Sequence, residues 1–445
     1  MQEWLWMTAA DLGRGIGAGE VDAVALTETY LEAIAAHPMA DRIYARTTPE
    51  RARAEAQAAA QRAATGMRRG PLDGVPVSWK DLFDTAGIAT EAGTRLMEGR
   101  VPEADAHVLA TATRAGLVCL GKTHMSEIAF SGLGLNPITA TPPNIHNSEL
   151  VPGGSSSGAA ASVAFGLAAA AIGSDTGGSV RIPSAWNDLV GLKTGHGRLS
   201  VAGTVPLCAS FDTVGPLCRS VEDASLLSAA LGDTPAADLE GAGVVGARLM
   251  VLETIALDDL QDTPLAAFET ALTSLELAGA RIERASFPPL QEAFDLAGTL
   301  YAAESYGWWR DLVEAAPDKM FPQILERVRG GRGVSGPDYV AAKSRLNEIR
   351  KAYLAATAGF DAVVIPTAPN MPPNAARLLA DEAYYRQQNL LALRNTRIGN
   401  LMDLVSLTLP TQSSSCGILF NMPKTDENRL LRLGAAAAPV VGPAG

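Results

Sequence analysis

The stretch from Pro152 to Arg181 constrains the fold of this chain more than any other. It reads PGGSSSGAAASVAFGLAAAAIGSDTGGSVR, with one glycine- and serine-rich turn at residues 153–158 and a second at residues 176–179. Glycine lets a turn adopt positive φ, and successive N–H groups in such turns converge on an anion. A serine hydroxyl beside those donors is placed to attack a carbonyl group, and the donors would stabilise the oxyanion that forms.

The apolar run between the two turns, residues 159–173, must be buried. It is shorter than the roughly 18 to 20 residues that a membrane span needs, and Ser162 and Gly166 interrupt it. We therefore expect a core helix followed by a core strand.

This stretch resembles the signature of the amidase signature family of serine hydrolases. That signature reads approximately GGSSSGSAAAVAAG, a spacer, and GTDTGGSIRxPAA, and the match here is long and without gaps. The resemblance implies that Ser179 is the nucleophile and that Ser155, 24 positions earlier, is a second catalytic serine that follows a cis peptide bond.

The resemblance also implies roles for the neighbours of the two serines. The backbone N–H groups of the second turn are expected to form the oxyanion hole, at Thr176, Gly177 and Gly178. Supporting roles are expected for Gly153, Gly154, Ser156, Asp175 and Arg181. We expect the last two to pair with each other or to cap the neighbouring helix, and so to hold the nucleophile turn.

Lys80 completes the predicted site. Val75, Val77 and Trp79 alternate as in a strand, and Lys80 stands at its end. A lysine in such a place is usually an ordinary surface or ion-pair residue. However, residues 71–94 resemble the family segment PLxGVPVxxKDxFDxxG, whose lysine is the third catalytic residue.

In the mechanism that this resemblance implies, burial keeps Lys80 neutral. Lys80 then withdraws a proton from Ser179 through the hydroxyl of Ser155, and water later hydrolyses the acyl-enzyme. No metal, nucleotide or organic cofactor is required.

Three further segments supply weaker candidates. The run GKTHMSE resembles the family segment that leads to the approach of the active site, which makes Met125 a candidate substrate contact. His124 could be an acid or base, but a polar loop residue is the favoured interpretation because Lys80 already supplies a base. In the run RNTRIGN, Arg394 or Arg397 could pair with a carboxylate of the substrate, although a structural ion pair is equally compatible.

The similarity to the family is continuous from about residue 70 to 230. It breaks at residues 192–200, LKTGHGRLS, where the family usually has LKPTxGRxS. The absence of that proline affects the expected shape of the loop and does not change the expected catalytic residues.

The resemblance implies an α/β fold: one large α/β/α domain with a central mixed, mostly parallel sheet covered by helices. Helical spacing predicts two helices within residues 8–36, with Thr8 as the first N-cap, and composition predicts an exposed helix over residues 49–64. The pattern after residue 231 predicts strands at residues 248–252, 281–285, 362–366, 405–409 and 417–420. The final residues, 435–445, are expected to fray.

No repeat, charge block or low-complexity linker divides the chain, which favours a single domain over residues 1–445. Residues 70–230 would be the core that carries the catalytic residues, and the helical segment 290–358 would shape the acyl pocket. The aromatic residues of that segment are more often core residues than ligand contacts: Tyr301, Trp308, Trp309 and Phe321.

Composition restricts the partners and the location. The formal charge of −12 disfavours binding to nucleic acid or to an anionic membrane through bulk charge. The start of the chain does not read as a signal peptide, which indicates the cytoplasm. Four cysteines without a C-x-x-C pair and only five histidines argue against a zinc site. Alanine-rich helices permit a homodimer without arguing for one.

Three functions are compatible with these features. The first is a stand-alone amidase that hydrolyses the C–N bond of a small carboxamide, or of a urea- or carbamoyl-type amide. The second is the glutaminase subunit of a tRNA-dependent amidotransferase, which the break at residues 194–196 and the RNTRIGN segment disfavour. The third is a non-catalytic protein whose glycine turns hold a phosphate, and the absence of both G-x-x-x-x-G-K-[ST] and G-x-G-x-x-G makes it the weakest.

Overall fold

A computed structural model describes residues 2–443 of the chain. Within that range, eleven strands form one sheet in the order β1-β3-β2-β4-β6-β5-β10-β11-β9-β7-β8. The strands are β1 (Tyr44–Thr47), β2 (Pro76–Lys80), β3 (Val118–Thr123), β4 (Ala170–Asp175), β5 (Val190–Lys193), β6 (Thr213–Cys218), β7 (Arg248–Leu252), β8 (Arg281–Ala285), β9 (Ala362–Pro366), β10 (Leu404–Pro410) and β11 (Gly417–Pro423).

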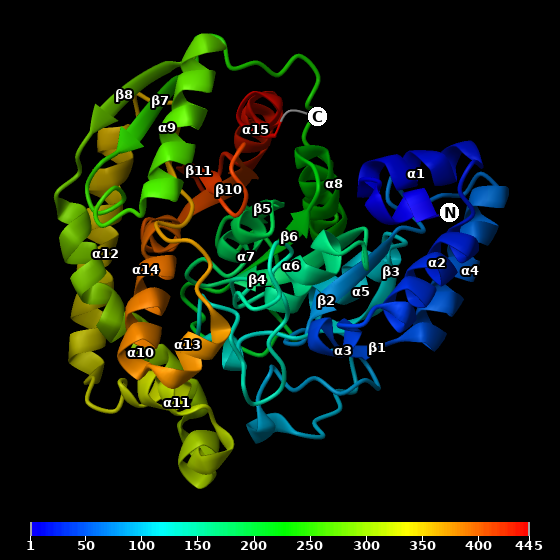
Figure 1. The fold of residues 1–445 in the computed structure, drawn as a ribbon, viewed down its shortest axis with the longest axis horizontal. Helices are drawn as coiled ribbons and strands as arrows, with labels where there is room; N and C mark the ends of the chain where they lie inside the picture. Colours follow the sequence, from blue (N-terminus) through cyan, green and yellow to red (C-terminus); the bar gives the residue numbers. More distant parts are fainter. Residues whose placement is uncertain (1, 444–445) are drawn as a thin grey trace.

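Helices cover this sheet (Figure 1). They are α1 (Ala9–Ala18), α2 (Ala23–Ala36), α3 (Ala40–Ile43), α4 (Pro49–Ala64), α5 (His107–Arg114), α6 (Ser157–Ala164), α7 (Arg181–Trp186), α8 (Val221–Gly232), α9 (Asp262–Leu277), α10 (Pro289–Ala315), α11 (Pro322–Arg329), α12 (Gly336–Thr357), α13 (Ala375–Ala380), α14 (Glu382–Leu401) and α15 (Glu427–Val441). In Figure 1 the blue helices α1, α2 and α4 lie at one end of the sheet, and α9 to α12 lie at the other.

The mixed sheet that the sequence predicts is present, but "mostly parallel" is wrong. Six of its ten strand pairs are antiparallel. The reason is the run β4-β6-β5-β10-β11-β9 in the middle of the sheet, where each neighbouring pair is antiparallel. Parallel pairing is confined to β2 with β3 and β4, and to β7 with β8 and β9.

Most of the local predictions are confirmed. The Thr8 side chain caps α1 by accepting from Asp11 N, and α4 spans the predicted residues. The apolar run forms most of α6 and then most of β4, and nearly all of its residues in these two elements are buried. The expected strands at residues 248–252, 281–285 and 362–366 are β7, β8 and β9.

The prediction of a frayed tail is wrong for the residues that the structure describes. Helix α15 continues through Pro439 to Val441, and residues 444–445 lie outside the described range. The helix persists because its apolar face is buried at Leu430, Ala437 and Val441. Packing against the sheet therefore outweighs the poor helix propensity of its last turn.

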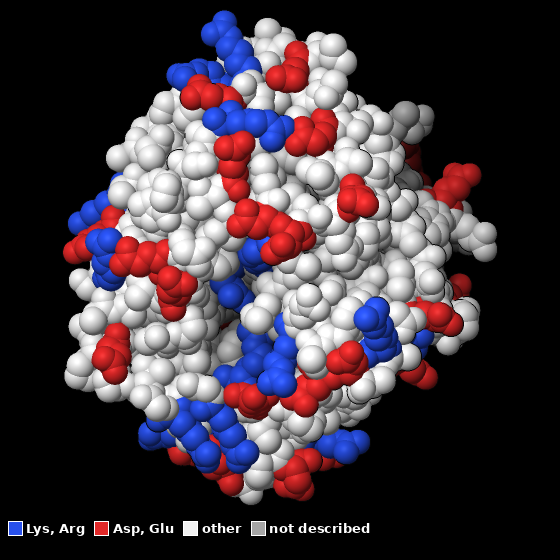
Figure 2. Space-filling view, turned by 60° about the vertical axis from the view of Figure 1, so that its left-hand side comes forward, with Lys and Arg blue, Asp and Glu red and all other residues white. Residues whose placement is uncertain are grey.

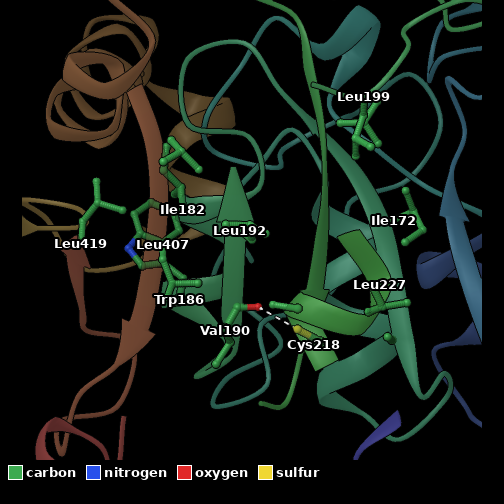
Figure 3. Close-up of a cluster of buried hydrophobic side chains, with 14 of the residues drawn as sticks. Ile172, Ile182, Trp186, Val190, Leu192, Leu199, Cys218, Leu227, Leu407 and Leu419 are labelled. Carbon is green, nitrogen blue, oxygen red and sulfur yellow. Dashed lines mark hydrogen bonds between the residues drawn. The ribbon is translucent and has the colours of Figure 1, made fainter. Parts of the chain in front are cut away.

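The core lies where the helices meet the antiparallel middle of the sheet. Figure 3 shows part of it: Ile182 and Trp186 of α7 lie beside Leu407 of β10 and Leu419 of β11. All four side chains are fully buried. This packing fixes α7, which begins directly after the second glycine turn.

Charged side chains of both signs are interspersed on the face that Figure 2 shows, and several basic ones gather in and below a hollow near its centre. Among residues 2–443, no helix combines the length and the apolar character required to cross a membrane.

Shortening a core side chain should destabilise the fold far more than shortening an exposed one. Leu407 is 0% exposed and Leu277 is 85% exposed. We expect Leu407→Ala to lower the free energy of unfolding by about 2–5 kcal/mol, because the lost apolar contacts leave a cavity. The control Leu277→Ala should stay within about 0.5 kcal/mol of the parent. Guanidinium titration followed by circular dichroism measures both, and equal shifts would contradict the packing.

Candidate active site

The two serine turns lie side by side at the carboxyl end of β4. The second turn links the end of β4 at Asp175 to the start of α7, and the first turn leads into α6. The expected cis peptide bond is present between Gly154 and Ser155. Ser156 N donates to Ser179 O at 3.1 Å, which joins the two turns directly.

Lys80 reaches this site from the neighbouring strand. Because β2 and β4 are parallel, with Trp79 opposite Ile172, their carboxyl ends meet at the same edge. Lys80 is fully buried, and its Nζ donates to Ser155 Oγ at 2.7 Å and to Ser174 Oγ at 2.8 Å. The structure thus joins two of the three predicted catalytic side chains.

Burial lowers the pKa of Lys80 to about 7, although the nearby charges of Asp175 and Asp212 oppose the shift. An ammonium group taken out of water loses its hydration, and the neutral amine loses much less. At neutral pH a substantial fraction of Lys80 is therefore the free amine, which can accept a proton.

Ser179 lies at the edge of a cavity and is nearly buried. Among residues 2–443, no partner pairs with its hydroxyl or with the N–H groups of Thr176, Gly177 and Ser179. The N–H of Gly178, which the sequence predicts as an oxyanion donor, donates instead to Asp175 Oδ1 at 2.9 Å. Three backbone donors of the nucleophile turn are thus without a hydrogen-bond partner among the described residues.

Asp175 and Arg181 hold the nucleophile turn, in the arrangement expected for them. Arg181 donates to Asp175 at 3.0 Å from Nε and at 2.8 Å from Nη2, and both side chains are completely buried. Asp175 also accepts from the backbone N–H groups of Gly178 and Val180. Burial by itself would raise the pKa of Asp175, but the charge and hydrogen bonds of Arg181 hold it well below the usual range.

Two glycines of the motif are required by space. Gly178 has φ +138°, and a Cβ there would overlap the Thr396 hydroxyl. At Gly154, a Cβ would lie 2.6 Å from Gly134 N. Side chains at either position would push the serine turns away from the segments that pack on them.

The cavity beside Ser179 has a volume of about 220 Å³. Its walls come from the loop after η3 (Glu127–Ala129), from the nucleophile turn and from α10, α11 and α14. Its lining residues are mostly apolar or small, with two arginines: Ala129, Phe130, Ser131, Thr176, Gly177, Ser179, Leu207, Ala297, Gly298, Tyr301, Ala302, Arg327, Leu390, Leu393 and Arg397. The volume is below the range of about 300–1,000 Å³ that is typical of drug-sized ligands, which indicates a small ligand.

Of the weaker candidates from the sequence, the structure places one in the cavity wall and the others outside it. Arg397 lines the cavity, whereas Arg394, one turn earlier on α14, donates to Asn395 Oδ1 and lies near Asp258 and Asp259. Met125 is fully buried outside the cavity lining. His124 also lies outside that lining, and burial lowers its pKa to about 4, so its imidazole is neutral at neutral pH.

The sequence did not predict the roles that several residues have at the site. Ser174, two positions from the nucleophile turn along β4, provides the second hydroxyl that binds Lys80. Tyr301 Oη donates to Thr176 O at 2.8 Å, and Thr396 Oγ1 donates to Gly177 O at 2.8 Å. Arg327 lines the cavity from α11. Ser174 adjoins the DTGGS motif and Thr396 lies in the RNTRIGN segment, whereas Tyr301 and Arg327 lie more than 100 positions from the nucleophile turn, where no local pattern marks them as cavity residues.

Of the other aromatic residues in the helical segment, Trp309 and Phe321 are core residues and Trp308 is exposed. Within residues 2–443, no group of three or more His, Cys, Asp or Glu side chains could hold a metal ion.

The chain is similar to known proteins over nearly its whole length. The protein family described as Amidase matches residues 25–431. The 2-amino-5-chloromuconic acid deaminase of Comamonas testosteroni is 35% identical over 436 residues, which cover 95% of this chain and 94% of that protein. A glutamyl-tRNA(Gln) amidotransferase subunit of Thermobifida fusca (strain YX) is 30% identical, covering 98% of this chain and 96% of that protein. A crystal structure described as an amidase is 30% identical and superposes with a TM-score of 0.88, covering 98% of this chain and 100% of that one.

Removing Asp175 should cost far more stability than removing a surface carboxylate. We expect Asp175→Ala to lower the free energy of unfolding by about 3–5 kcal/mol, because Arg181 would remain buried without its counter-charge. Glu269, which pairs with Arg284 at the surface, is the matched control, and Glu269→Ala should cost less than about 1 kcal/mol. Chemical denaturation measures both variants. An Asp175→Ala protein as stable as the control would refute the role of the pair.

Proposed function

This chain belongs to the amidase family, and from that premise we propose that it hydrolyses the C–N bond of a small carboxamide, or of a urea- or carbamoyl-type amide, through a serine acyl-enzyme. Members of the family are hydrolases that act on C–N bonds in amides. The product that leaves first would be ammonia or an amine.

One observation carries this proposal: the 2.7 Å contact between Lys80 Nζ and Ser155 Oγ, beside a cavity that contains Ser179. A serine hydroxyl is a weak nucleophile until a base accepts its proton. Lys80, with its pKa lowered to about 7, supplies that base. Ser155 contacts this base, and its neighbour Ser156 donates from its backbone N–H to Ser179 O at 3.1 Å.

In the proposed acylation step, Ser179 Oγ attacks the amide carbonyl carbon. Its proton passes to the Ser155 hydroxyl, whose own proton passes to Lys80 Nζ. The carbonyl oxygen becomes an oxyanion, and the N–H groups of Thr176, Gly177 and Ser179 would stabilise it. The C–N bond then breaks, and the leaving nitrogen takes the proton back from Lys80 through Ser155.

Deacylation would repeat these transfers with water. Neutral Lys80 accepts a proton of the water through Ser155, and the hydroxide attacks the ester carbon. The ester bond to Ser179 breaks, Ser179 regains its proton, and a carboxylic acid leaves. We assign Ser156, Gly153 and Gly154 to holding the first turn, and Asp175 with Arg181 to holding the second.

We also propose that residues 1–445 act as one domain, with the catalytic groups in residues 70–230 and the cavity wall in residues 290–358. Support comes from α10 and α11, which lie in the second range and line the cavity. For location we propose the cytoplasm. All four cysteines are free and buried, which is usual for proteins of a reducing compartment.

The alternative function is that of an amidotransferase glutaminase subunit, for which the Thermobifida fusca relative is named. The cavity argues against glutamine as the substrate. Glutamine carries an α-ammonium group, and none of the described lining residues is acidic. We therefore favour the stand-alone amidase.

Ammonia release from a panel of primary amides, amino-acid amides, glutamine and urea-type compounds tests the proposal. We expect one class to be hydrolysed. In Ser179→Ala and in Lys80→Ala, kcat should fall at least about 1,000-fold, because the first variant lacks the hydroxyl that accepts the acyl group and the second lacks the base that accepts the proton. A fluorophosphonate probe should label Ser179. Activity that survives Ser179→Ala would refute the proposal, and glutaminase activity that appears only with partner subunits would favour the alternative.

The pH dependence of kcat/KM should follow the titration of Lys80. The charged ammonium cannot accept a proton, so activity should fall as the pH drops through about 7 and level off above it. The charge of Asp212 raises the Lys80 pKa, so Asp212→Asn should move this limb to lower pH. A profile that stays flat between about pH 6 and pH 8 would contradict Lys80 as the base.

A further inference from the structure

Two arginine side chains from different helices line the cavity that contains Ser179. Arg327 belongs to α11 and Arg397 to α14. Neither forms an ion pair with a carboxylate of residues 2–443. Arg327 donates to Phe130 O at 2.6 Å and lies 4.2 Å from the centroid of the Phe130 ring, and the Arg397 guanidinium lies 5.7 Å from the centroid of the Tyr301 ring.

These two charges are close enough to act on each other. Burial and the neighbouring Arg397 lower the pKa of Arg327 to about 10, and burial lowers the pKa of Arg397 as well. Both guanidinium groups remain charged at neutral pH. Since none of the described lining residues is acidic, the cavity holds two positive charges without a counter-charge. A bound anion would relieve this cost.

The arginines are also held in place before any ligand binds. Glu127 Oε2 accepts from Phe321 N at 2.9 Å, which fixes the start of α11 against the loop that carries Phe130. The ring of Tyr301 is held by its hydrogen bond to Thr176 O and by stacking on Phe211 at 4.5 Å. Groups that are already positioned bind a ligand with a smaller loss of entropy.

Apart from the two arginines and a few hydroxyl side chains, the cavity wall is apolar. Ala129, Leu207, Ala297 and Leu393 contribute to its wall, together with Ser179. Such a wall suits methylene groups, whereas the two guanidinium groups suit a carboxylate, which their planar donors can bind in bidentate fashion. A short chain can thus place one end at Ser179 and the other at the arginines.

We propose that the substrate is a monoamide of a short dicarboxylic acid, whose free carboxylate is bound by Arg327 and Arg397 while its amide carbon lies at Ser179. This inference rests on the proposed amidase function. Because none of the described lining residues is acidic, an α-ammonium group on the same chain has no acidic partner among them. The cavity therefore selects against glutamine and asparagine.

The first experiment measures binding and does not depend on turnover. Succinate and glutarate are titrated calorimetrically into the full-length protein, with glutaramide as the ligand of matched length that carries no carboxylate. We expect glutarate to bind at least about 30-fold more tightly than glutaramide, and Arg397→Gln and Arg327→Gln each to remove that advantage. Arg397→Lys should retain part of it, because the charge stays but the fork is lost.

The matched control is Arg386→Gln, an exposed arginine of the same helix that pairs with Glu326 and Glu382. It should bind dicarboxylates as the parent does. Equal affinity for glutarate and glutaramide, or a preference that both cavity variants keep, would overturn the proposal. Arg397→Gln provides the decisive comparison if the loss of the Phe130 contact prevents Arg327→Gln from folding.

The second experiment compares kcat/KM for glutaramate, glutaramide and glutamine, and for the corresponding four-carbon compounds. Glutaramate should exceed both others by about 30-fold or more, and Arg397→Gln should reduce its advantage mainly through KM. Faster hydrolysis of acetyl-β-alanine, with its carboxylate on the leaving amine, would overturn the acyl placement. Hydrolysis of neutral amides without any preference would overturn this inference and leave the proposed function intact. If no amide is hydrolysed, the proposed function fails, and the binding experiment still decides whether the arginines hold a carboxylate.

Discussion

The buried pair of Asp175 and Arg181 is the interaction on which the site depends. It connects three segments: Asp175 accepts from the nucleophile turn, and Arg181 also donates to Thr396 O and Asn400 Oδ1 on α14. Because two buried charges are tolerated only with nearly complete hydrogen bonding, this geometry allows little displacement. The position of Ser179 relative to the sheet is thus set by electrostatics as well as by packing.

A second constraint separates the charges of the site. Lys80 is surrounded by hydroxyl groups and loses its charge easily because it is buried, although Asp175 and Asp212 lie near. The cavity arginines, Arg327 and Arg397, cannot lose theirs near neutral pH. Lys80 can therefore exchange protons while the two arginines keep their positive charge, so the group that transfers protons is separate from the groups that would attract an anion.

The sequence predicts the chemistry of this site better than its shape. Ser155, Ser179 and Lys80 lie in continuous motifs whose turns and strand positions local patterns reveal. Arg327 could not be found in this way, because only the packing of α11 against the loop at Phe130 brings it to the cavity. The sequence pattern does not predict strands β5 and β6, because Gly191 and the Gly215-Pro216 pair interrupt their short apolar runs. Helix α15 likewise extends to Val441 because it packs against other parts of the fold, which the sequence of the tail alone does not indicate.

Tyr301 contributes to the cavity wall with its ring and to the nucleophile turn with its hydroxyl. Any search for variants with altered substrate range would naturally randomise α10, because that helix borders the cavity and lies outside the catalytic motifs in the sequence. At Tyr301 such a library would change the alignment of the turn together with the volume of the cavity. Ala297 and Ala302 border the cavity without a side-chain hydrogen bond to the turn, whereas at Tyr301 even a replacement by phenylalanine, which keeps the ring, would remove the hydrogen bond to Thr176 O.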